Sequence, residues 1–186
     1  MGSKKRYTDL ELLSRIGSGG KEHDAAFTEL YSRYSHSIYL YCRRLAGNEA
    51  DADDVYQETF LRFYKKARQG EQIQTVQAYL LRIARNVFLN MKRDSPQTSM
   101  LEDRDIVMKS EDYEKKEMYS MISTALELLD FSYREAFVLR FYQGLSYKEM
   151  AATTGDTVSA LKVRVMRAKE QIREILSPYI SDLSKI

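Results

Sequence analysis

The stretch between Thr157 and Arg173 concentrates positive charge in a way that suits nucleic acid. It holds five lysines and arginines against one acid, in a chain whose formal net charge is only +2. Placed on a helix, its apolar residues share one face and most of its basic residues lie opposite. Small residues near the start let such a helix approach a DNA duplex, while longer basic side chains reach phosphates or base edges. The residues that we expect to contact DNA are Ser159, Ala160, Lys162, Val163, Arg164 and Arg167.

A shorter helix is expected directly before this one. Ser146-Tyr147-Lys148-Glu149 has the pattern of a capping box, in which a serine and a glutamate accept hydrogen bonds from each other's backbone N–H groups. Gly155-Asp156-Thr157 then provides a tight turn into the basic helix. This layout is that of a helix-turn-helix, whose second helix enters the major groove of DNA. The alternative, a basic amphipathic helix that only packs on its own domain, stays open.

A helix expected over residues 76–93 has a polar face without acidic residues. Arginines and asparagines beside an aromatic ring suit a DNA strand whose bases are partly unstacked. The alternative is that these basic residues pair with acids on neighbouring helices. The residues of this face that we expect to contact DNA are Tyr79, Arg82, Arg85 and Asn86.

The helix expected over residues 49–68 begins with the opposite charge, since residues 48–58 contain five acids and no base. Apolar side chains rimmed by carboxylates are typical of a protein-binding surface. A calcium site is the alternative, but Asp51-Ala52-Asp53-Asp54 lacks the glycine and the terminal glutamate of a calcium loop. Five residues of this helix share one outward arc of about 100°, namely Asp53, Asp54, Gln57, Leu61 and Tyr64.

These surfaces need helices to hold them, and the composition favours helices throughout. Among 186 residues there are only two prolines and eight glycines, and stretches rich in Glu, Lys, Arg, Leu and Ala dominate. The predicted fold class is therefore all-α. The helices expected in the first half cover residues 22–46, 49–68 and 76–93, after an N-terminal segment (1–21) that opens with the capping box Thr8–Glu11.

Residues 94–112 interrupt this pattern. Pro96, several Ser and Thr residues and scattered acids break every apolar period, which indicates a flexible linker. A second helical group is expected over residues 113–178, with a capping box at Ser132–Glu135, a helix end at Ser177-Pro178 and a tail over 179–186. The sequence therefore predicts two small helical domains joined by a linker.

Several classes of protein are disfavoured. The single cysteine, Cys42, rules out an internal disulfide and fits a reducing compartment, where we expect it to pack between helices. No apolar run approaches the length of a membrane span, and residues 1–6 lack the apolar core of a signal peptide, so we expect a cytoplasmic protein. The chain has only two histidines, and Gly17–Lys21 departs from a phosphate-binding loop. We expect no enzyme, no metal site and no cofactor.

Four short motifs in order resemble the extracytoplasmic-function group of bacterial sigma factors. The run from Asp53 to Leu61 is similar to that family's DxxQExF helix, and the run from Tyr79 to Asn86 to its WLxxIARN helix. Gly144–Ala151 is similar to GLSYKEIA, and Lys162-Val163-Arg164 falls where the family has VKSR. The similarity covers residues 22–176. The sequence departs from the family's motifs at a few positions: Tyr79 stands for tryptophan, Ser159-Ala160 for Gly-Thr and Val163 for serine. These differences concern the preferred promoter sequence more than membership of the family.

The resemblance implies a function and partners. It implies that Asp53, Asp54, Gln57 and Leu61 bind core RNA polymerase, at the clamp coiled coil of its largest subunit. The helix at 76–93 with its preceding loop would read the −10 element of promoter DNA, and the helix-turn-helix would read the −35 element. Residues 22–93 would be sigma region 2 and residues 113–178 sigma region 4, with an anti-sigma factor as a further partner. The alternative is a helix-turn-helix regulator that binds operator DNA without polymerase.

Overall fold

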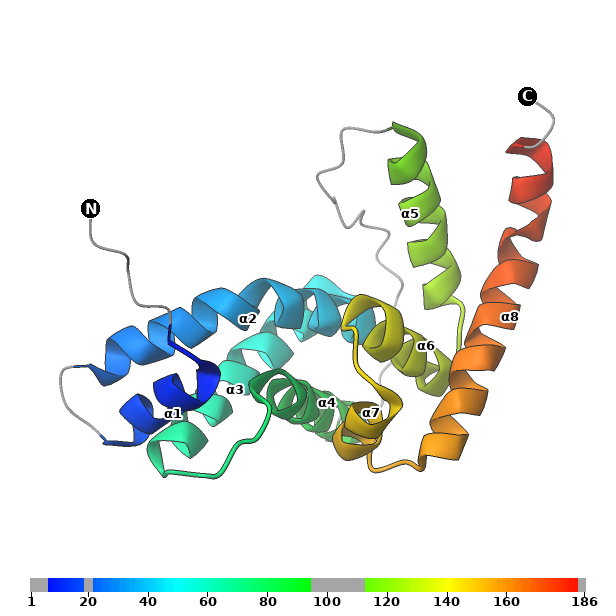
Figure 1. Ribbon diagram of the computed structural model, residues 1–186. Helices are drawn as coiled ribbons and strands as arrows, with labels where there is room; N and C mark the ends of the chain where they lie inside the picture. Colours follow the sequence, from blue (N-terminus) through cyan, green and yellow to red (C-terminus); the bar gives the residue numbers. More distant parts are fainter. Residues whose placement is uncertain (1–6, 19–21, 95–112, 184–186) are drawn as a thin grey trace. The chain divides into compact units, whose positions relative to one another are not determined.

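The computed structural model describes residues 7–18, 22–94 and 113–183, which belong to two compact units, Met1–Thr98 and Ser99–Ile186 (Figure 1). Every regular element within these described ranges is a helix, which confirms the all-α prediction. The predicted linker lies outside the described residues except for Asp94, which ends a helix.

The first unit contains α1 (Asp9–Ser18), α2 (His23–Ala46), α3 (Glu49–Arg68) and α4 (Val76–Asp94). The sequence explains the sharp turn from α2 to α3. Gly47 adopts a φ of 77°, a left-handed conformation that favours glycine, and so ends α2. The side chain of Asn48 then accepts a hydrogen bond from the N–H of Asp51 at 2.8 Å and caps α3.

Aromatic packing fixes how α3 lies on α2. The rings of Tyr31 and Phe60 meet edge to face with 4.8 Å between their centroids, and those of Phe27 and Tyr64 do the same. Such pairs contribute about 0.5–1.5 kcal/mol each beyond the area that they bury. The side of α3 that packs in the unit is apolar, so the acidic residues of the helix lie on its other side; the buried apolar residues include Ala52, Val55, Phe60 and Phe63.

The N-terminal helix α1 is part of the first unit. Its predicted capping box forms, because the N–H of Thr8 donates to the Glu11 carboxylate at 2.7 Å and the N–H of Glu11 donates to the Thr8 hydroxyl at 3.3 Å. The carboxylate of Asp9 accepts hydrogen bonds from Nη1 of Arg33, at 2.7 Å, and from the hydroxyl of Tyr34. These bonds attach the start of α1 to α2.

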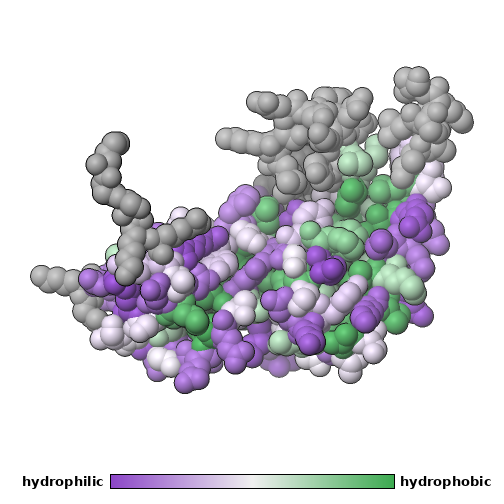
Figure 2. All heavy atoms as spheres, viewed as in Figure 1, coloured by the Kyte–Doolittle hydropathy of each residue, from purple (hydrophilic) through white to green (hydrophobic). Residues whose placement is uncertain are grey.

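The second unit contains α5 (Tyr113–Glu127), α6 (Phe131–Phe137), a π-helical turn η1 (Val138–Tyr142), α7 (Tyr147–Thr154) and α8 (Val158–Leu183). Figure 2 shows apolar atoms gathered where α5, α6 and α8 lie. Beneath the surface, a cluster of buried residues joins α5 to α8, made of Ala125, Leu126, Leu129, Ala168, Ile172 and Leu176.

Two predicted helix boundaries in the second unit are wrong. The capping box at Ser132–Glu135 does not form, because α6 already begins at Phe131 with Asp130 as its N-cap residue, and Glu135 is buried inside the helix. The last helix does not end at Ser177-Pro178 but continues through Pro178 to Leu183. A proline inside a helix removes one backbone hydrogen bond and bends the helix, but it does not always end it.

Candidate nucleic-acid and protein-binding surfaces

The turn between α7 and α8 has the geometry of a helix-turn-helix. The hydroxyl of Ser146 accepts a hydrogen bond from the N–H of Glu149 at 3.3 Å, and the Glu149 carboxylate accepts one from the N–H of Ser146 at 2.8 Å, so this capping box is confirmed. Gly155 ends α7 with a φ of 80°. The hydroxyl of Thr157 accepts a hydrogen bond from the N–H of Ala160 at 3.2 Å. Caps on both sides of a short turn hold the start of α8 relative to α7.

The solvent side of α8 carries the predicted DNA-contacting residues. Leu161, Val165 and Ala168 are buried in the unit, which directs the opposite face outward. Val163 and Met166 stand on that outward face, 44% and 52% exposed, although both are apolar. Of the six predicted residues, four are exposed and two are half-buried; the exposed ones are Ser159, Lys162, Val163 and Arg167, and the half-buried ones Ala160 and Arg164.

The guanidinium of Arg164 is held by a carboxylate from the turn. Its Nη1 donates to Oδ2 of Asp156 at 2.6 Å and its Nη2 donates to Oδ1 at 3.0 Å. The two side chains are 28% and 26% exposed. Arg167 also has a partner, since its Nη1 donates to the Tyr133 hydroxyl at 3.4 Å. Two of the predicted DNA-contacting residues are therefore already bonded within the second unit.

On α4, the predicted residues lie beside the loop that precedes the helix. Arg82 and Asn86 are exposed, while Tyr79 and Arg85 are half-buried. The Tyr79 hydroxyl donates to Glu71 at 2.9 Å, and the guanidinium carbon of Arg82 lies 5.0 Å from the centroid of the Tyr79 ring. Burial, together with the hydrogen bond to Glu71, raises the pKa of Tyr79 to about 12, so the phenol stays neutral. A neutral ring held in place at the surface is a platform on which a base can stack.

A pocket of about 310 Å³ lies between the end of α3 and this part of α4. From α4 it is lined by Tyr79, Ile83 and Asn86. Basic residues are common at the end of a helix because they interact favourably with the helix dipole. The basic residues at the end of α3 therefore do not indicate a binding site from the sequence alone. The α3 side of this pocket was therefore not predicted from the sequence; it is formed by Arg62, Lys65, Lys66 and Gln69.

The alternative reading of α4, in which its basic residues pair with acids of neighbouring helices, holds for Lys92. Its Nζ lies 3.1 Å from Oδ2 of Asp51 on α3. Because this ion pair joins two helices of the first unit, we assign Lys92 to the stability of the unit. It lies at the far end of α4 from Tyr79 and was not among the predicted contact residues.

The acidic face of α3 has one strongly exposed apolar side chain. Leu61 is 48% exposed, and Gln57 and Asp54 are exposed one turn and two turns before it, respectively. Asp53 is half-buried on the same side. Tyr64 was predicted to lie on this face, but it is half-buried, with its ring against Phe27. The surface is therefore Leu61 with polar neighbours on a helix whose position is fixed by aromatic packing.

Comparison with known proteins assigns the two units. A model of sigma-70 region 2 matches residues 30–96, and a model of sigma-70 region 4 matches residues 119–172, so that together they cover more than half of the chain. The chain belongs to the sigma-70 family. Region 2 thus matches the first unit, which contains α3 and α4, and region 4 matches the second unit, which contains the helix-turn-helix.

Several curated relatives of the chain are named as extracytoplasmic-function (ECF) sigma factors. The chain is 32% identical over 169 residues to the ECF RNA polymerase sigma factor SigE of Mycolicibacterium smegmatis, covering 86% of this chain and 65% of SigE. It is 26% identical over 189 residues to the RNA polymerase sigma-H factor of Pseudomonas aeruginosa, covering 94% and 96%. The chain therefore spans a little under two thirds of SigE but nearly all of the sigma-H factor.

Two solved structures share the fold. CnrH, in complex with the cytosolic domain of CnrY, is 25% identical with a TM-score of 0.68, covering 91% of this chain and 97% of that one. The sigma factor RpoE of Bartonella quintana, in complex with the anti-sigma factor NepR, is 23% identical with a TM-score of 0.71, covering 81% and 96%. Both proteins were solved with a partner bound.

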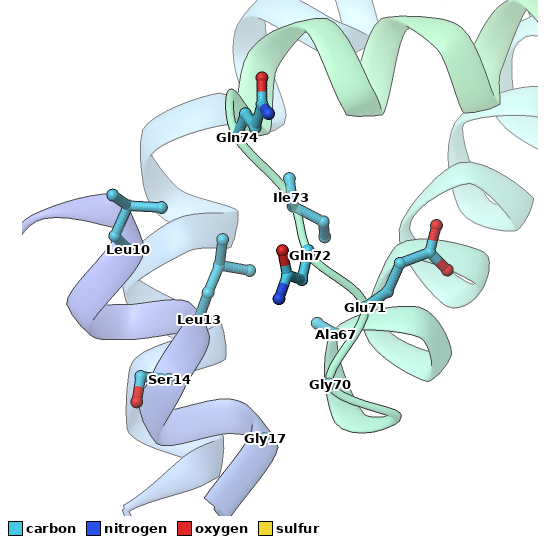
Figure 3. A pocket seen from close by; sticks show the side chains of 10 residues that line it. All are labelled: Leu10, Leu13, Ser14, Gly17, Ala67, Gly70, Glu71, Gln72, Ile73 and Gln74. Carbon is cyan, nitrogen blue, oxygen red and sulfur yellow. The ribbon is translucent and has the colours of Figure 1, made fainter.

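In this sigma factor, α1 precedes the residues matched by the region 2 model and faces the loop before α4 (Figure 3). A groove of about 540 Å³ separates α1 from that loop. Leu13 of α1 and Gln72 of the loop extend into the groove from opposite sides, while Glu71 points away from it. Ile73 is buried, so the loop has an apolar anchor of its own.

Other kinds of site find no support in the described ranges. No three His, Cys, Asp or Glu side chains there are grouped so that they could hold a metal ion. Among the described helices, none is long and apolar enough to cross a membrane. Cys42 is buried, and its burial raises the pKa of the thiol to about 12, so the thiol stays protonated and packs between helices.

Proposed function

We propose that the chain is a transcription initiation factor that binds core RNA polymerase and directs it to promoters by recognising −10 and −35 elements. One observation carries the proposal: the two sigma-70 regions occur in order in a single chain, and each has a basic, polar helix face turned to solvent. A protein of this kind acts by binding and has no catalytic chemistry of its own. It works in the cytoplasm, where polymerase and promoter DNA are.

Core polymerase binds at the acidic face of α3 in this proposal. An exposed leucine beside carboxylates offers the apolar centre and polar rim of a protein interface. Exposed Leu61 would be buried on binding, and the acids beside it would meet basic residues of the polymerase. The residues assigned to this contact are Asp53, Asp54, Gln57 and Leu61.

The −10 element is recognised on α4 and the pocket beside it. Single-stranded DNA is bound by a positive surface that follows the backbone and by aromatic rings on which bases stack. Lys65 and Lys66 supply charge on one side of the pocket, and Tyr79 supplies the ring on the other. The residues assigned to this contact are Tyr79, Arg82, Arg85 and Asn86, to which we add Arg62, Lys65 and Lys66.

The −35 element is recognised by the helix-turn-helix. The caps around Gly155 hold α8 so that its first turns can enter a major groove. The exposed apolar side chain of Val163 suits contact with a thymine methyl group. The residues assigned to this contact are Ser159, Ala160, Lys162, Val163, Arg164 and Arg167.

The domain limits follow the same proposal. Residues 22–93 form region 2 and residues 113–178 form region 4, with the linker at 94–112 between them. We also propose that an anti-sigma factor binds this chain, since CnrH was solved with CnrY and RpoE of Bartonella quintana with the anti-sigma factor NepR.

Run-off transcription tests the proposal directly. The purified chain and core polymerase would be combined on a library of genomic fragments, and we expect discrete transcripts that require both components. The control measures DNA binding by the chain without core polymerase, because a helix-turn-helix regulator would bind specific DNA on its own. Specific DNA binding by the chain alone, with no core-dependent transcripts and no co-purification with core, would overturn the proposal in favour of an operator-binding regulator.

A further inference from the structure

We propose that Asp156 is a positioning residue that sets Arg164 to read a guanine of the −35 element, so that the two side chains act as one base-reading unit. The inference rests on the proposed function and adds a residue outside the predicted contact set. It starts from the two hydrogen bonds, of 2.6 and 3.0 Å, that join the Arg164 guanidinium to the Asp156 carboxylate.

The position of the pair follows from the direction of helical side chains. Side chains on a helix lean toward its N-terminus, so the long chain of Arg164 extends toward the turn that precedes α8. Ala160, one turn earlier on the same side, is small and leaves room for it. Asp156 is itself fixed in the turn, because its N–H donates to the hydroxyl of Thr154 at 3.2 Å. The pair therefore lies at the end of α8 that enters a groove first.

The hydrogen bonds leave Arg164 able to read a base. A guanidinium has five N–H donors, and a carboxylate that bonds Nη1 and Nη2 uses two of them. The Nε–H and the second hydrogen of Nη2 project side by side along another edge of the same planar group. Two parallel donors of this kind match O6 and N7 of guanine in the major groove, which is the commonest specific contact of arginine with DNA. Because Asp156 already holds the guanidinium, less side-chain freedom is lost when the base is bound.

The charge of the pair argues against a phosphate contact. Asp156 neutralises Arg164 and brings a negative charge to the same place, and a DNA phosphate is repelled by that charge. Arg173 is also exposed on α8 and belongs to its later turns, where phosphate contact is expected. Each lysine or arginine that contacts a phosphate adds about one unit to the salt slope, which is the dependence of the logarithm of the binding constant on the logarithm of the salt concentration. Arg173→Ala should therefore reduce the salt slope by about one unit, and Arg164→Ala should reduce it by clearly less.

A selection experiment on complete holoenzyme tests the proposal. Core polymerase carrying the wild-type chain or a variant would be presented with promoter duplexes randomised over the −35 element, and the bound sequences would be counted. Wild-type holoenzyme should require guanine at one position, favouring it by roughly 5- to 150-fold over the other bases. Asp156→Asn, which keeps the shape but removes the charge, should reduce that preference at the same position as Arg164→Lys. The double variant should lose no more than either single variant.

Glu170→Gln is the matched control, because it removes one exposed negative charge from the same helix and leaves the Asp156–Arg164 pair intact. It should keep the wild-type preference for guanine. The proposal is overturned if Asp156→Asn keeps the full preference, or if it weakens binding equally on all sequences, since either result would make the pair a brace for the turn. If wild-type holoenzyme shows no −35 preference at all, the proposed function itself fails.

Discussion

The hydroxyl of Tyr79 donates a hydrogen bond to the carboxylate of Glu71 at 2.9 Å, while Nζ of Lys66 lies 3.3 Å from the other oxygen of that carboxylate. Glu71 thus ties its loop to α4 through Tyr79 and to α3 through Lys66. The hydrogen bond from Tyr79, followed by the contact with Lys66, lowers the pKa of Glu71, so the carboxylate stays ionised. One side of the proposed −10 surface is therefore held in place before DNA arrives.

The first prediction separates the ring of Tyr79 from its hydroxyl. Tyr79→Ala should reduce promoter opening by about 1–3 kcal/mol, because it removes the surface on which a base stacks. Tyr79→Phe keeps the ring, loses the hydroxyl with its bond to Glu71, and should retain most of the opening. Permanganate reactivity of the −10 thymines, counted per bound complex, measures the effect. Equal losses in both variants would assign the role to the hydroxyl bond and the loop instead.

The second prediction concerns the lysines on the other side of the pocket. Lys65→Ala with Lys66→Ala should weaken holoenzyme binding to a non-template −10 oligonucleotide. The salt slope should fall by about 0.7 for Lys65 and by less for Lys66, because Glu71 already pairs with Lys66. Fluorescence anisotropy over a range of salt would measure both quantities. Lys148→Ala is the control, since this exposed lysine lies on α7 in the other unit. An unchanged salt slope in the double variant would remove Lys65 and Lys66 from the DNA surface.

The third prediction tests Arg85 and Asn86, which were selected from the sequence. Replacing both by Ala should reduce melting of the −10 element more than it reduces binding of the closed duplex, because their proposed partner is an unstacked strand. Permanganate reactivity and closed-complex binding at low temperature would give the two quantities. A loss of closed-complex binding with normal melting per bound complex would give α4 a different role.

The fourth prediction concerns the acidic face. Leu61→Arg places a charge where we expect the interface to be apolar, and Asp54→Ala with Gln57→Ala removes its polar rim. Truncating a buried, paired interface charge costs about 2–5 kcal/mol, so affinity for core polymerase should fall by at least tenfold. Leu128→Arg is the matched control, because Leu128 is 63% exposed in the other unit. Unchanged core affinity with Leu61→Arg, at unchanged helix content, would contradict the assignment.

The sequence predicted the parts of the fold that depend on local signals. The ranges of α2, α3 and α4 and the caps at Thr8 and Ser146 follow from helical periodicity and capping patterns, and both agree with the structure. The start of α6 was predicted wrongly, because both Asp130 and Ser132 are residue types that cap helices, and the packing of the unit decides which of them is used. Helix α8 passed Pro178 for a similar reason: the pattern marks a weak point and tertiary structure decides whether the helix ends there.

The candidate surfaces could also be predicted only in part from the sequence. Most of the residues that face outward on α3, α4 and α8 could be predicted, since this follows from periodicity within one helix. Tyr64 is the exception on α3, because its ring packs on Phe27 of α2 and is half-buried. The partners of the outward-facing residues could not be predicted, because they come from other elements. Glu71 of the loop accepts a hydrogen bond from Tyr79 of α4, and Lys65 of α3 lines the same pocket as Asn86 of α4. Asp156 was seen only as a turn residue. Its bond to Arg164 depends on how the turn enters α8, which no spacing rule specifies.

The fifth prediction concerns the cap that holds the helix-turn-helix. Ser146→Ala should destabilise the second unit by about 1 kcal/mol at neutral pH, since it leaves the N–H of Glu149 without its cap. Hydrogen exchange of the amides of α7 in the intact chain would report the change. Slower or unchanged exchange in Ser146→Ala would show that packing alone holds α7.

The same cap should depend on pH in a defined direction. The hydrogen bonds from Ser146 lower the pKa of Glu149 in the folded chain, so the folded state favours the ionised carboxylate. The stabilisation is therefore complete above the unfolded pKa of a glutamate, about 4.3, and is lost as the pH falls through the lower folded value. Glu149→Gln can still accept the bond from the N–H of Ser146, but it cannot titrate. Protection of the α7 amides should therefore decline below about pH 4.3 more steeply in the wild-type chain than in Glu149→Gln. Parallel declines in the two proteins would assign the acid sensitivity to other carboxylates of the unit and leave Glu149 with a purely geometric role.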